Sequence, residues 1–286
     1  MSTPTVRVVC VVYHPGPELD DFATSLTTAL TTAGSSVELV IVDNGTDQSR
    51  SRAVADEHGA RLVVPGANIG YGAGTNIGAA DARAPWLVVC NSDLVWQPGS
   101  LDALVAAGES HPRAGSLGPA LLNPDGTVYP SARELPSLTQ GAGHATLGRV
   151  WPGNPWTRAY QARQETVGDE RAAGWLSGAC LVLRREAFEQ LGGFDESYFM
   201  FFEDVDLGER LGRAGWTNLY VPAAHVVHIG GTSWRSRPAP MIRAHHASAY
   251  RYLARRYSRW YQAPVRWAVR AGLGLRQAWE LRLAAR

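Results

Sequence analysis

The chain has 286 residues, of which 45% are hydrophobic, and its formal net charge is +1. This length and composition suffice for a large buried core and exclude a disordered or fibrous protein. The three cysteines, Cys10, Cys90 and Cys180, are far apart in apolar runs and form no CxxC pair, so we expect buried free thiols in a reducing compartment.

The first hundred residues predict a parallel sheet. Apart from Arg7, residues 6–12 are an apolar, β-branched run, typical of a strand buried on both faces. The alternation of strands and helices that follows indicates right-handed βαβ units, whose ligands bind beyond the carboxyl ends of the strands. We expect further strands at 37–42, 61–64 and 86–90, and helices at 19–33, at 49–58 and from about Gly74.

Residues 123–172 are rich in Pro, Gly, Trp and polar residues and predict a long insertion over the sheet. Beyond it we expect a strand over 175–184, helices over 185–191 and 203–214, and a helical tail interrupted near Pro264. The predicted domains are 1–240 and 241–286. No charged and apolar leader precedes the first strand, and no run of about eighteen apolar residues occurs, so we expect a cytoplasmic protein that does not span a membrane.

Polar residues follow three of the predicted strands. An Asp43 carboxylate can accept hydrogen bonds from a base imide or a ribose hydroxyl, and the Tyr13 ring can stack on a base. For each residue alone, the polarity of an ordinary turn is an alternative explanation. Together they favour a nucleotide site. The three segments are Tyr13-His14, Asp43-Asn44 and Asn91-Ser92-Asp93.

Residues 68–78 are glycine-rich and open a helix, so their backbone amides can approach a diphosphate or a sugar. They do not form a dinucleotide fingerprint, because Thr75 and Ile77 stand where a GxGxxG pattern needs glycine. A tight loop with close helix packing is the alternative.

Two residues suit a divalent cation. Asp93 directly follows an apolar strand, and hard cations prefer oxygen ligands. His225 and His228 end another strand-like segment, and their spacing points them to opposite faces, so at most one is expected to bind a ligand. We favour His228, which adjoins glycines; a core histidine is the alternative. The hydroxyls of Thr232 and Ser233 can bind phosphate.

Three acids, Glu203, Asp204 and Asp206, follow an aromatic run at the start of a helix. Acids are stabilising at a helix N-terminus, which explains at least one of them. A partly desolvated carboxylate there can act as general base on an acceptor hydroxyl. We expect Asp206 to cap the helix or to pair with Arg210.

The tail is basic and aromatic. Residues 243–286 hold ten of the 27 arginines and one acid, Glu280. Arginine with interfacial aromatic residues suits an anionic bilayer surface. A solvated helical hairpin or a dimer contact is the alternative, and nucleic acid is disfavoured because the rest of the chain is acidic and lacks a recognition motif. The aromatic residues are Tyr250, Tyr252, Tyr257, Trp260, Tyr261, Trp267 and Trp279.

Taken together, these segments resemble the family 2 inverting glycosyltransferases of GT-A fold, in particular bacterial rhamnosyltransferases. The likeness covers about residues 5–235. It rests on Val-Val-Tyr-His at 11–14, Asp-Asn-Gly at 43–45, Asn-x-Gly-Tyr-Gly-x-Gly-x-Asn at 68–76, Asn-Ser-Asp at 91–93, Gly-Ala-Cys-Leu-Val-Leu-Arg-Arg at 178–185, Gly-Gly-Phe-Asp-Glu at 192–196, Phe-Glu-Asp-Val-Asp-Leu at 202–207 and His-x-x-Gly-x-Ser at 228–233.

The resemblance implies an α/β fold with a mostly parallel central sheet and a helical C-terminal extension. It makes Asp204 the catalytic base, and Asp93 and His228 ligands of Mn²⁺ or Mg²⁺. The family usually has Asp where Asn91 stands, which implies a weaker metal site. Implied nucleotide contacts are Val12, Tyr13, Asp43, Asn68, Gly70, Asn76, Asn91 and Ser92. Implied contacts to the acceptor or diphosphate are Trp175, Gly178, Glu203, Thr232, Ser233 and Arg235.

The resemblance further implies transfer of L-rhamnose from dTDP-rhamnose to a hydroxyl of GlcNAc-diphosphoryl-polyprenol, in cell-wall assembly at the inner face of the plasma membrane. Alternatives are a UDP- or GDP-sugar donor, or a non-catalytic nucleotide- or lipid-binding module. A nucleotidyltransferase is disfavoured because no Gly-rich loop with Arg and Lys follows the first strand.

Overall fold

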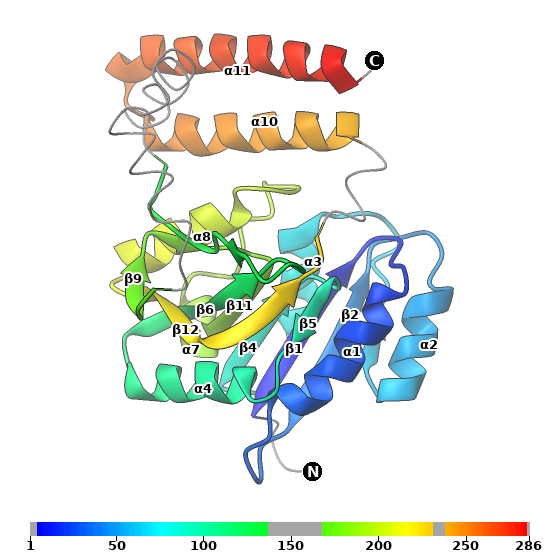
Figure 1. The fold of residues 1–286 in the computed structure, drawn as a ribbon. Helices are drawn as coiled ribbons and strands as arrows, with labels where there is room; N and C mark the ends of the chain where they lie inside the picture. The colour runs from blue at the N-terminus through cyan, green and yellow to red at the C-terminus, as the bar shows by residue number, and fades with distance from the viewer. Residues whose placement is uncertain (1–4, 137–167, 231–237, 285–286) are drawn as a thin grey trace.

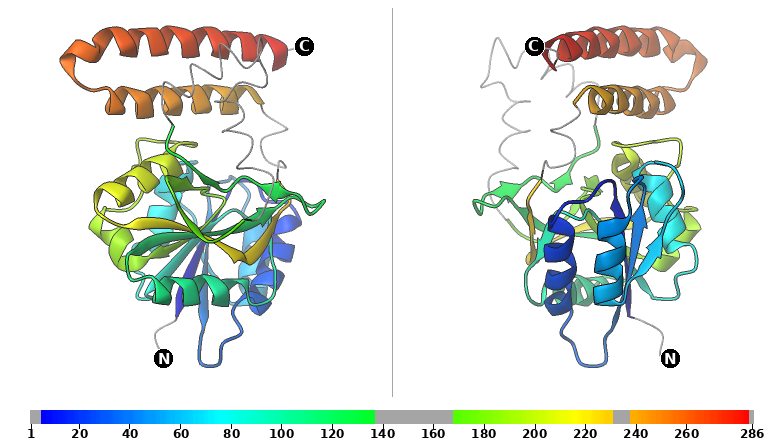
Figure 2. Two further views of the ribbon diagram at one scale, coloured as in Figure 1. Left: turned by 60° about the vertical axis from the view of Figure 1, so that its left-hand side comes forward. Right: turned by 90° about the vertical axis from the view of Figure 1, so that its right-hand side faces the viewer.

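The computed structural model describes residues 5–136, 168–230 and 238–284. Its centre is one large mixed sheet with helices on both faces, and a pair of long helices lies above the sheet (Figure 1). The first described strand begins at the opposite end of the molecule from these two helices (Figures 1 and 2).

Most strands of the sheet run parallel, as predicted. The strand order is β3-β2-β1-β4-β11-β6-β12-β5, in which β11 and β5 are antiparallel to their neighbours. The strands of this path are β1 (Val6–Val12), β2 (Val37–Asp43), β3 (Arg61–Val63), β4 (Trp86–Cys90), β5 (Leu94–Trp96), β6 (Ala114–Leu122), β11 (Cys180–Arg184) and β12 (Thr217–His228). Short strands β7 (Val128–Tyr129) and β9 (Arg171–Ala173) extend the sheet, and β8 (Ala132–Arg133) pairs separately with β10 (Trp175–Leu176).

Two hydrophobic clusters fill the two faces of the sheet. Alternate residues of β1 enter opposite clusters, with Val8 and Cys10 in one and Val9 in the other, which explains the apolar run in the sequence. Helices α1 (Glu18–Ala29), α2 (Ser49–His58) and α4 (Ser100–Ser110) contribute to the first cluster, and α3 (Tyr71–Ala79), α7 (Arg185–Gln190) and α8 (Glu203–Arg213) to the second.

Several predicted bounds were wrong. Helix α3 begins at Tyr71 rather than near Gly74, because Gly70, with φ 90°, takes the left-handed conformation that ends the loop. The strand predicted over 175–184 is two strands, β10 and β11, separated by a turn at 177–179. Helix α1 ends at Ala29, earlier than predicted. The three cysteines are buried and free, as expected, while the reducing compartment stays a prediction.

The tail forms a helical hairpin of α10 (Pro238–Arg256), a short 3₁₀ helix (Trp260–Gln262) and α11 (Ala263–Ala284). Helix α10 lies between α11 and the edge of the sheet where the parallel strands end (Figures 1 and 2). Pro264 lies in the first turn of α11, where proline is tolerated. Among the described helices, none has the length and apolar character needed to cross a bilayer.

Candidate functional site

The ends of β1 and β2 form one side of the site. Tyr13 follows β1, is 36% exposed, and meets the His14 ring edge-on at 4.3 Å between centroids. His14 has φ 51°, an unusual conformation for a residue with a side chain. The exposed Tyr13 ring is accessible at this edge, and its contact with a base stays a prediction, whereas the preceding Val12 side chain is buried in the core.

Asp43 is placed differently from the expectation. Its side chain is fully buried, and its two carboxylate oxygens accept hydrogen bonds from the Gly45 backbone N–H at 2.7 Å and the Ser51 hydroxyl at 2.5 Å. In this conformation the carboxylate fixes the turn after β2 and presents no surface to a ligand. Direct nucleotide contact through Asp43 therefore stays a prediction.

The glycine-rich loop supports the segment that carries the acids. The Asn68 side-chain oxygen accepts a hydrogen bond from the Gly70 N–H at 3.1 Å, and the Tyr71 N–H donates to the Phe199 carbonyl at 3.0 Å. A Cβ on Gly70 would lie 2.2 Å from that same carbonyl oxygen. The loop thus packs backbone against backbone, which is why glycine stands at position 70.

Asn76 has a structural position. Its amide nitrogen donates to the Phe194 carbonyl at 2.9 Å and to Glu196 Oε1 at 3.0 Å, while its oxygen accepts the Phe194 N–H at 2.9 Å. Both amide hydrogens are used inside the chain, so in this conformation Asn76 joins α3 to residues 194–196. Its predicted nucleotide contact has no support from this geometry.

The predicted base lies at the start of α8. Phe201 and Phe202 both take left-handed φ angles, 66° and 67°, and turn the chain into the helix. Asp204 Oδ2 then accepts the Gly178 N–H at 2.8 Å, and Oδ1 accepts its neighbour Val205 N–H at 2.8 Å. The Tyr71 hydroxyl donates to the Gly178 carbonyl at 2.6 Å, so both backbone polar groups of Gly178 are held.

The two adjacent carboxyls have unusual acidities. Burial raises the pKa of Asp204, although hydrogen bonds from the Gly178 and Val205 backbone oppose the rise. Burial, followed by the charge of Asp204, raises the pKa of Glu203 to about 8. Glu203 is 6% exposed, and its Oε2 has no hydrogen-bond partner among the described residues. Ionisation of both carboxyls at once is therefore disfavoured, and the pKa values belong to the pair.

Asp93 and His228 are brought together by strand pairing. His228 ends β12 opposite Leu94 of β5, and the Ile229 N–H donates to the Asp93 carbonyl at 2.9 Å. His228 Nε2 consequently lies 3.3 Å from Asp93 Oδ1, and that oxygen is buried with no hydrogen-bond partner among the described residues. Asn91 and Ser92 lie beside this pair on the loop from β4 to β5, partly buried. The described residues contain no group of three His, Cys, Asp or Glu arranged to hold a metal.

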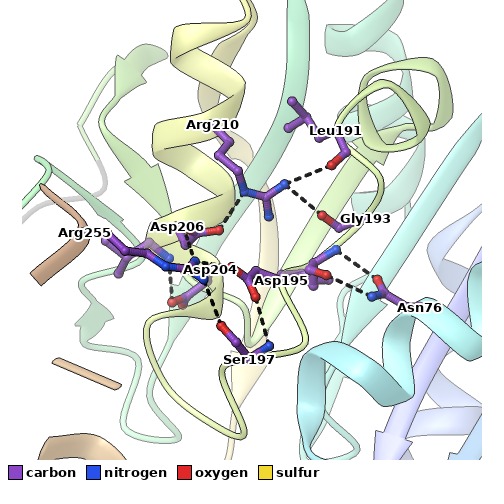
Figure 3. A network of polar contacts seen from close by, with 11 residues as sticks. Asn76, Leu191, Gly193, Asp195, Ser197, Asp204, Asp206, Arg210 and Arg255 are labelled. Carbon is purple, nitrogen blue, oxygen red and sulfur yellow. Dashed lines mark hydrogen bonds and ion pairs between the residues drawn. The ribbon is translucent and has the colours of Figure 1, made fainter. Parts of the chain in front are cut away.

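A polar network ties the acidic helix to the hairpin (Figure 3). Arg210 pairs with Asp206 at 2.6 Å, as expected from their spacing, and donates to the Gly193 carbonyl at 2.9 Å. Arg255 of α10 pairs with Asp195 and donates to the Ser197 hydroxyl at 3.3 Å. A cavity of about 210 Å³ between α8 and α10 is lined by Asp206, Glu209, Arg210, Arg213, Tyr252, Arg255 and Arg256.

Helix α10 of the hairpin also packs on the residues that precede Asp204. The centre of the Phe202 ring lies 5.6 Å from that of the His245 ring and 5.7 Å from that of the Tyr252 ring, and the Ser248 hydroxyl donates to the Met200 carbonyl at 2.8 Å.

Of the remaining predicted contacts, Trp175 donates its indole N–H to the Glu134 carbonyl at 3.1 Å. Thr232, Ser233 and Arg235 lie outside the described residues.

Sequence comparison identifies relatives over nearly the whole chain. The sequence model of the family "Glycosyltransferase like family 2" matches residues 4–263. The N-acetylglucosaminyl-diphospho-decaprenol L-rhamnosyltransferase of Mycobacterium tuberculosis H37Rv is 50% identical over 287 aligned positions, 96% of this chain and 92% of the relative. The rhamnosyltransferase WbbL of Escherichia coli K12 is 38% identical over 93 positions, 32% of this chain and 35% of the relative.

Solved structures share the fold at low sequence identity. GalNAc-T7, solved with UDP, GalNAc and Mn²⁺, matches with a TM-score of 0.58 at 16% identity, over 81% of this chain and 45% of that one. The mannosyltransferase PcManGT of Pyrobaculum calidifontis, solved with GDP-mannose and Mn²⁺, matches with a TM-score of 0.56 at 20% identity, over 99% and 74%. These matches confirm the predicted GT-A fold. The chain belongs to glycosyltransferase family 2 and is a glycosyl-transferring enzyme.

Proposed function

We propose that this enzyme transfers L-rhamnose from dTDP-rhamnose to GlcNAc-diphosphoryl-polyprenol, with inversion at the anomeric carbon. The observation that carries the proposal is the 50% identity to the mycobacterial rhamnosyltransferase over 96% of this chain and 92% of the relative. A match that long includes the strand-end loops, the glycine-rich loop and the acidic helix together. A UDP- or GDP-sugar donor is the alternative.

Asp204 is the proposed general base. Its two backbone hydrogen bonds fix the carboxylate, and burial raises its pKa toward that of a useful proton acceptor. In the reaction the acceptor oxygen forms a bond to the anomeric carbon as the bond to the diphosphate breaks. Asp204 takes the hydroxyl proton, and the bonding electrons leave with the nucleotide diphosphate. A proton on the adjacent Glu203 prevents a second negative charge from repelling the substrates.

Asp93 and His228 are the proposed ligands of a divalent cation. The residues fit such an ion, because a buried Asp93 oxygen that lacks a hydrogen-bond partner among the described residues faces an imidazole nitrogen at 3.3 Å. A bound cation would stabilise the negative charge that develops on the departing diphosphate. With Asn91 in place of an acid, this chain contributes one carboxylate, so we expect donor oxygens to complete the coordination and metal affinity to rise when nucleotide binds.

The hairpin is proposed to bind the cytoplasmic face of an anionic membrane, where a polyprenyl-linked acceptor resides. Trp260 is 86% exposed, Trp267 73% and Leu275 75%, and no residue of α11 is buried. Arginines accompany these apolar side chains, and each basic residue near an anionic surface contributes about 1 kcal/mol. This surface lies above the edge of the sheet where the parallel strands end (Figure 1).

The function is tested with purified enzyme, Mn²⁺ and a short-chain GlcNAc-diphosphoryl lipid. Transfer is measured in parallel with dTDP-rhamnose, UDP-glucose and GDP-mannose. We expect product with dTDP-rhamnose and a 10²- to 10⁴-fold lower rate for Asp204→Asn, roughly the contribution of a general base, with nucleotide binding retained. Equal rates for wild type and Asp204→Asn contradict the assignment of the base. Transfer from UDP-glucose or GDP-mannose alone contradicts the donor.

Membrane binding is tested by co-sedimentation with vesicles. We expect wild type to bind phosphatidylglycerol-containing vesicles and a Trp260→Ala/Trp267→Ala variant to bind them less, while Val64→Ala, which removes an exposed apolar side chain from the sheet domain, binds like wild type. If wild type does not bind the vesicles and is dimeric in solution, whereas the double variant is monomeric, the hairpin forms a dimer contact instead.

A further inference from the structure

Arg133 is a basic residue for which the sequence patterns predicted no role. It lies on β8 opposite Trp175 of β10. Its guanidinium carbon is 5.4 Å from the centre of the Trp175 ring and 5.9 Å from the centre of the Tyr129 ring. Its Nε donates to the Pro130 carbonyl at 2.9 Å. Two rings and one carbonyl therefore fix the head group before any ligand arrives.

Arg133 forms no direct ion pair in the part of the chain that the structure describes. Its contacts there are the two rings and the Pro130 carbonyl, and none is an ion pair with a carboxylate. The buried Arg7 differs, since it pairs with Glu38 and Asp81. Guanidinium has five N–H donors, so four of those of Arg133 have no acceptor among the described residues.

Arg133 lies between the two halves of the site. On one side the Tyr129 ring meets the His228 ring edge-on at 5.5 Å. On the other side Trp175 packs against α8, since a Cβ on Gly208 would lie 2.7 Å from the Trp175 Cβ. The charge of Arg133 also contributes to lowering the pKa of Asp204. A group that spans from the Asp93–His228 pair toward the base therefore passes this guanidinium.

We propose that Arg133 binds the diphosphate group of a substrate and adds positive charge there, beside a metal site to which Asn91 supplies no carboxylate. A planar guanidinium matches two phosphate oxygens at once, and its stacking on two rings reduces the side-chain freedom lost on binding. The inference rests on the proposed function, in which donor and acceptor both carry a diphosphate. The donor diphosphate is the leaving group, so its growing charge gains most from a fixed cation.

The test compares Arg133→Ala and Arg133→Lys with wild type. Arg184→Lys is the matched control, because Arg184 also stacks on an aromatic ring, with its guanidinium carbon 4.6 Å from the centre of the Trp86 ring. Trp86 begins β4, so it lies at the end of that strand away from Asn91. Calorimetry with Mn²⁺ measures the affinities for dTDP and dTMP. We expect Arg133→Ala to weaken dTDP binding roughly 10- to 100-fold, as for a lost charge-assisted contact, and dTMP binding much less. Arg133→Lys retains the charge without the bidentate geometry and should lie between. Thermal unfolding checks that each variant is folded.

A second arm distinguishes the two diphosphates. If dTDP binding is unchanged but the KM for the GlcNAc-diphosphoryl lipid rises 10-fold or more, Arg133 binds the acceptor diphosphate. If folded Arg133→Lys and Arg133→Ala match wild type in dTDP affinity and in both KM values, the inference is wrong. Wild-type enzyme that transfers no rhamnose contradicts the proposed function instead, and the dTDP-to-dTMP comparison still decides the role of Arg133.

Discussion

Glu203→Gln tests the protonation of the buried carboxyl pair through stability. Burial and the charge of Asp204 raise the pKa of Glu203 from 4.5 to about 8 in the folded protein. Between these values the unfolded chain has released a proton that the folded chain keeps, so the free energy of unfolding falls as pH rises. The slope is about 1.4 kcal/mol per pH unit, which makes the loss from pH 5 to pH 7 roughly 3 kcal/mol.

The Gln variant has no such proton, so its free energy of unfolding lacks this pH dependence. We expect the difference, variant minus wild type, to rise by roughly 3 kcal/mol from pH 5 to pH 7 and to level off above the folded pKa. The extra buried amide hydrogen shifts this difference by a constant and leaves its slope unchanged. Urea unfolding at fixed ionic strength measures it. Glu57→Gln on the exposed face of α2 is the control. A difference that is constant with pH means that Glu203 is ionised in the folded protein.

Three further predictions concern the site. Because Asp204 must be deprotonated to act and its pKa is raised, kcat/KM should fall as pH falls through a value above 3.8, the ordinary pKa of Asp; a profile that is flat down to that value contradicts this. Gly70→Ala should destabilise the fold by roughly 2 kcal/mol or more, since φ is 90° and the Cβ meets the Phe199 carbonyl; an unchanged melting temperature contradicts the described loop. Asn91→Asp should increase Mn²⁺ affinity several-fold in calorimetry with dTDP present, and equal affinity would mean that position 91 does not reach the metal.

The sequence predicted best where one physical signal dominates. The β-branched run of β1 and the acids at the start of α8 needed no tertiary information, and both lie where expected. Roles that depend on distant partners were harder to predict. Asp43 and Asn76 are polar residues in loops that suit a nucleotide, yet Ser51 and Phe194 take up their hydrogen-bonding groups. Polarity alone does not distinguish a residue that binds a ligand from one that supports a turn.

Arg133 was missed for a related reason. Strands β8 and β10 are two residues long and pair across more than forty residues of sequence, so no periodic pattern marks them. The available signal was an arginine between Tyr129 and Trp175, but the second ring lies near it only in the folded chain. The turn at 177–179 was missed similarly, because the bond from the Gly178 N–H to Asp204 is long-range.

The left-handed pair Phe201 and Phe202 has a consequence for engineering the enzyme. Each costs roughly 1–2 kcal/mol relative to an ordinary backbone conformation, a cost that glycine at these positions would remove. Glycine at position 202 would remove the ring that contacts His245 and Tyr252 of α10. Losing that packing costs at least as much as the strain that glycine relieves, so thermal tolerance would not improve, and the contact between the hairpin and the base-bearing turn would be lost.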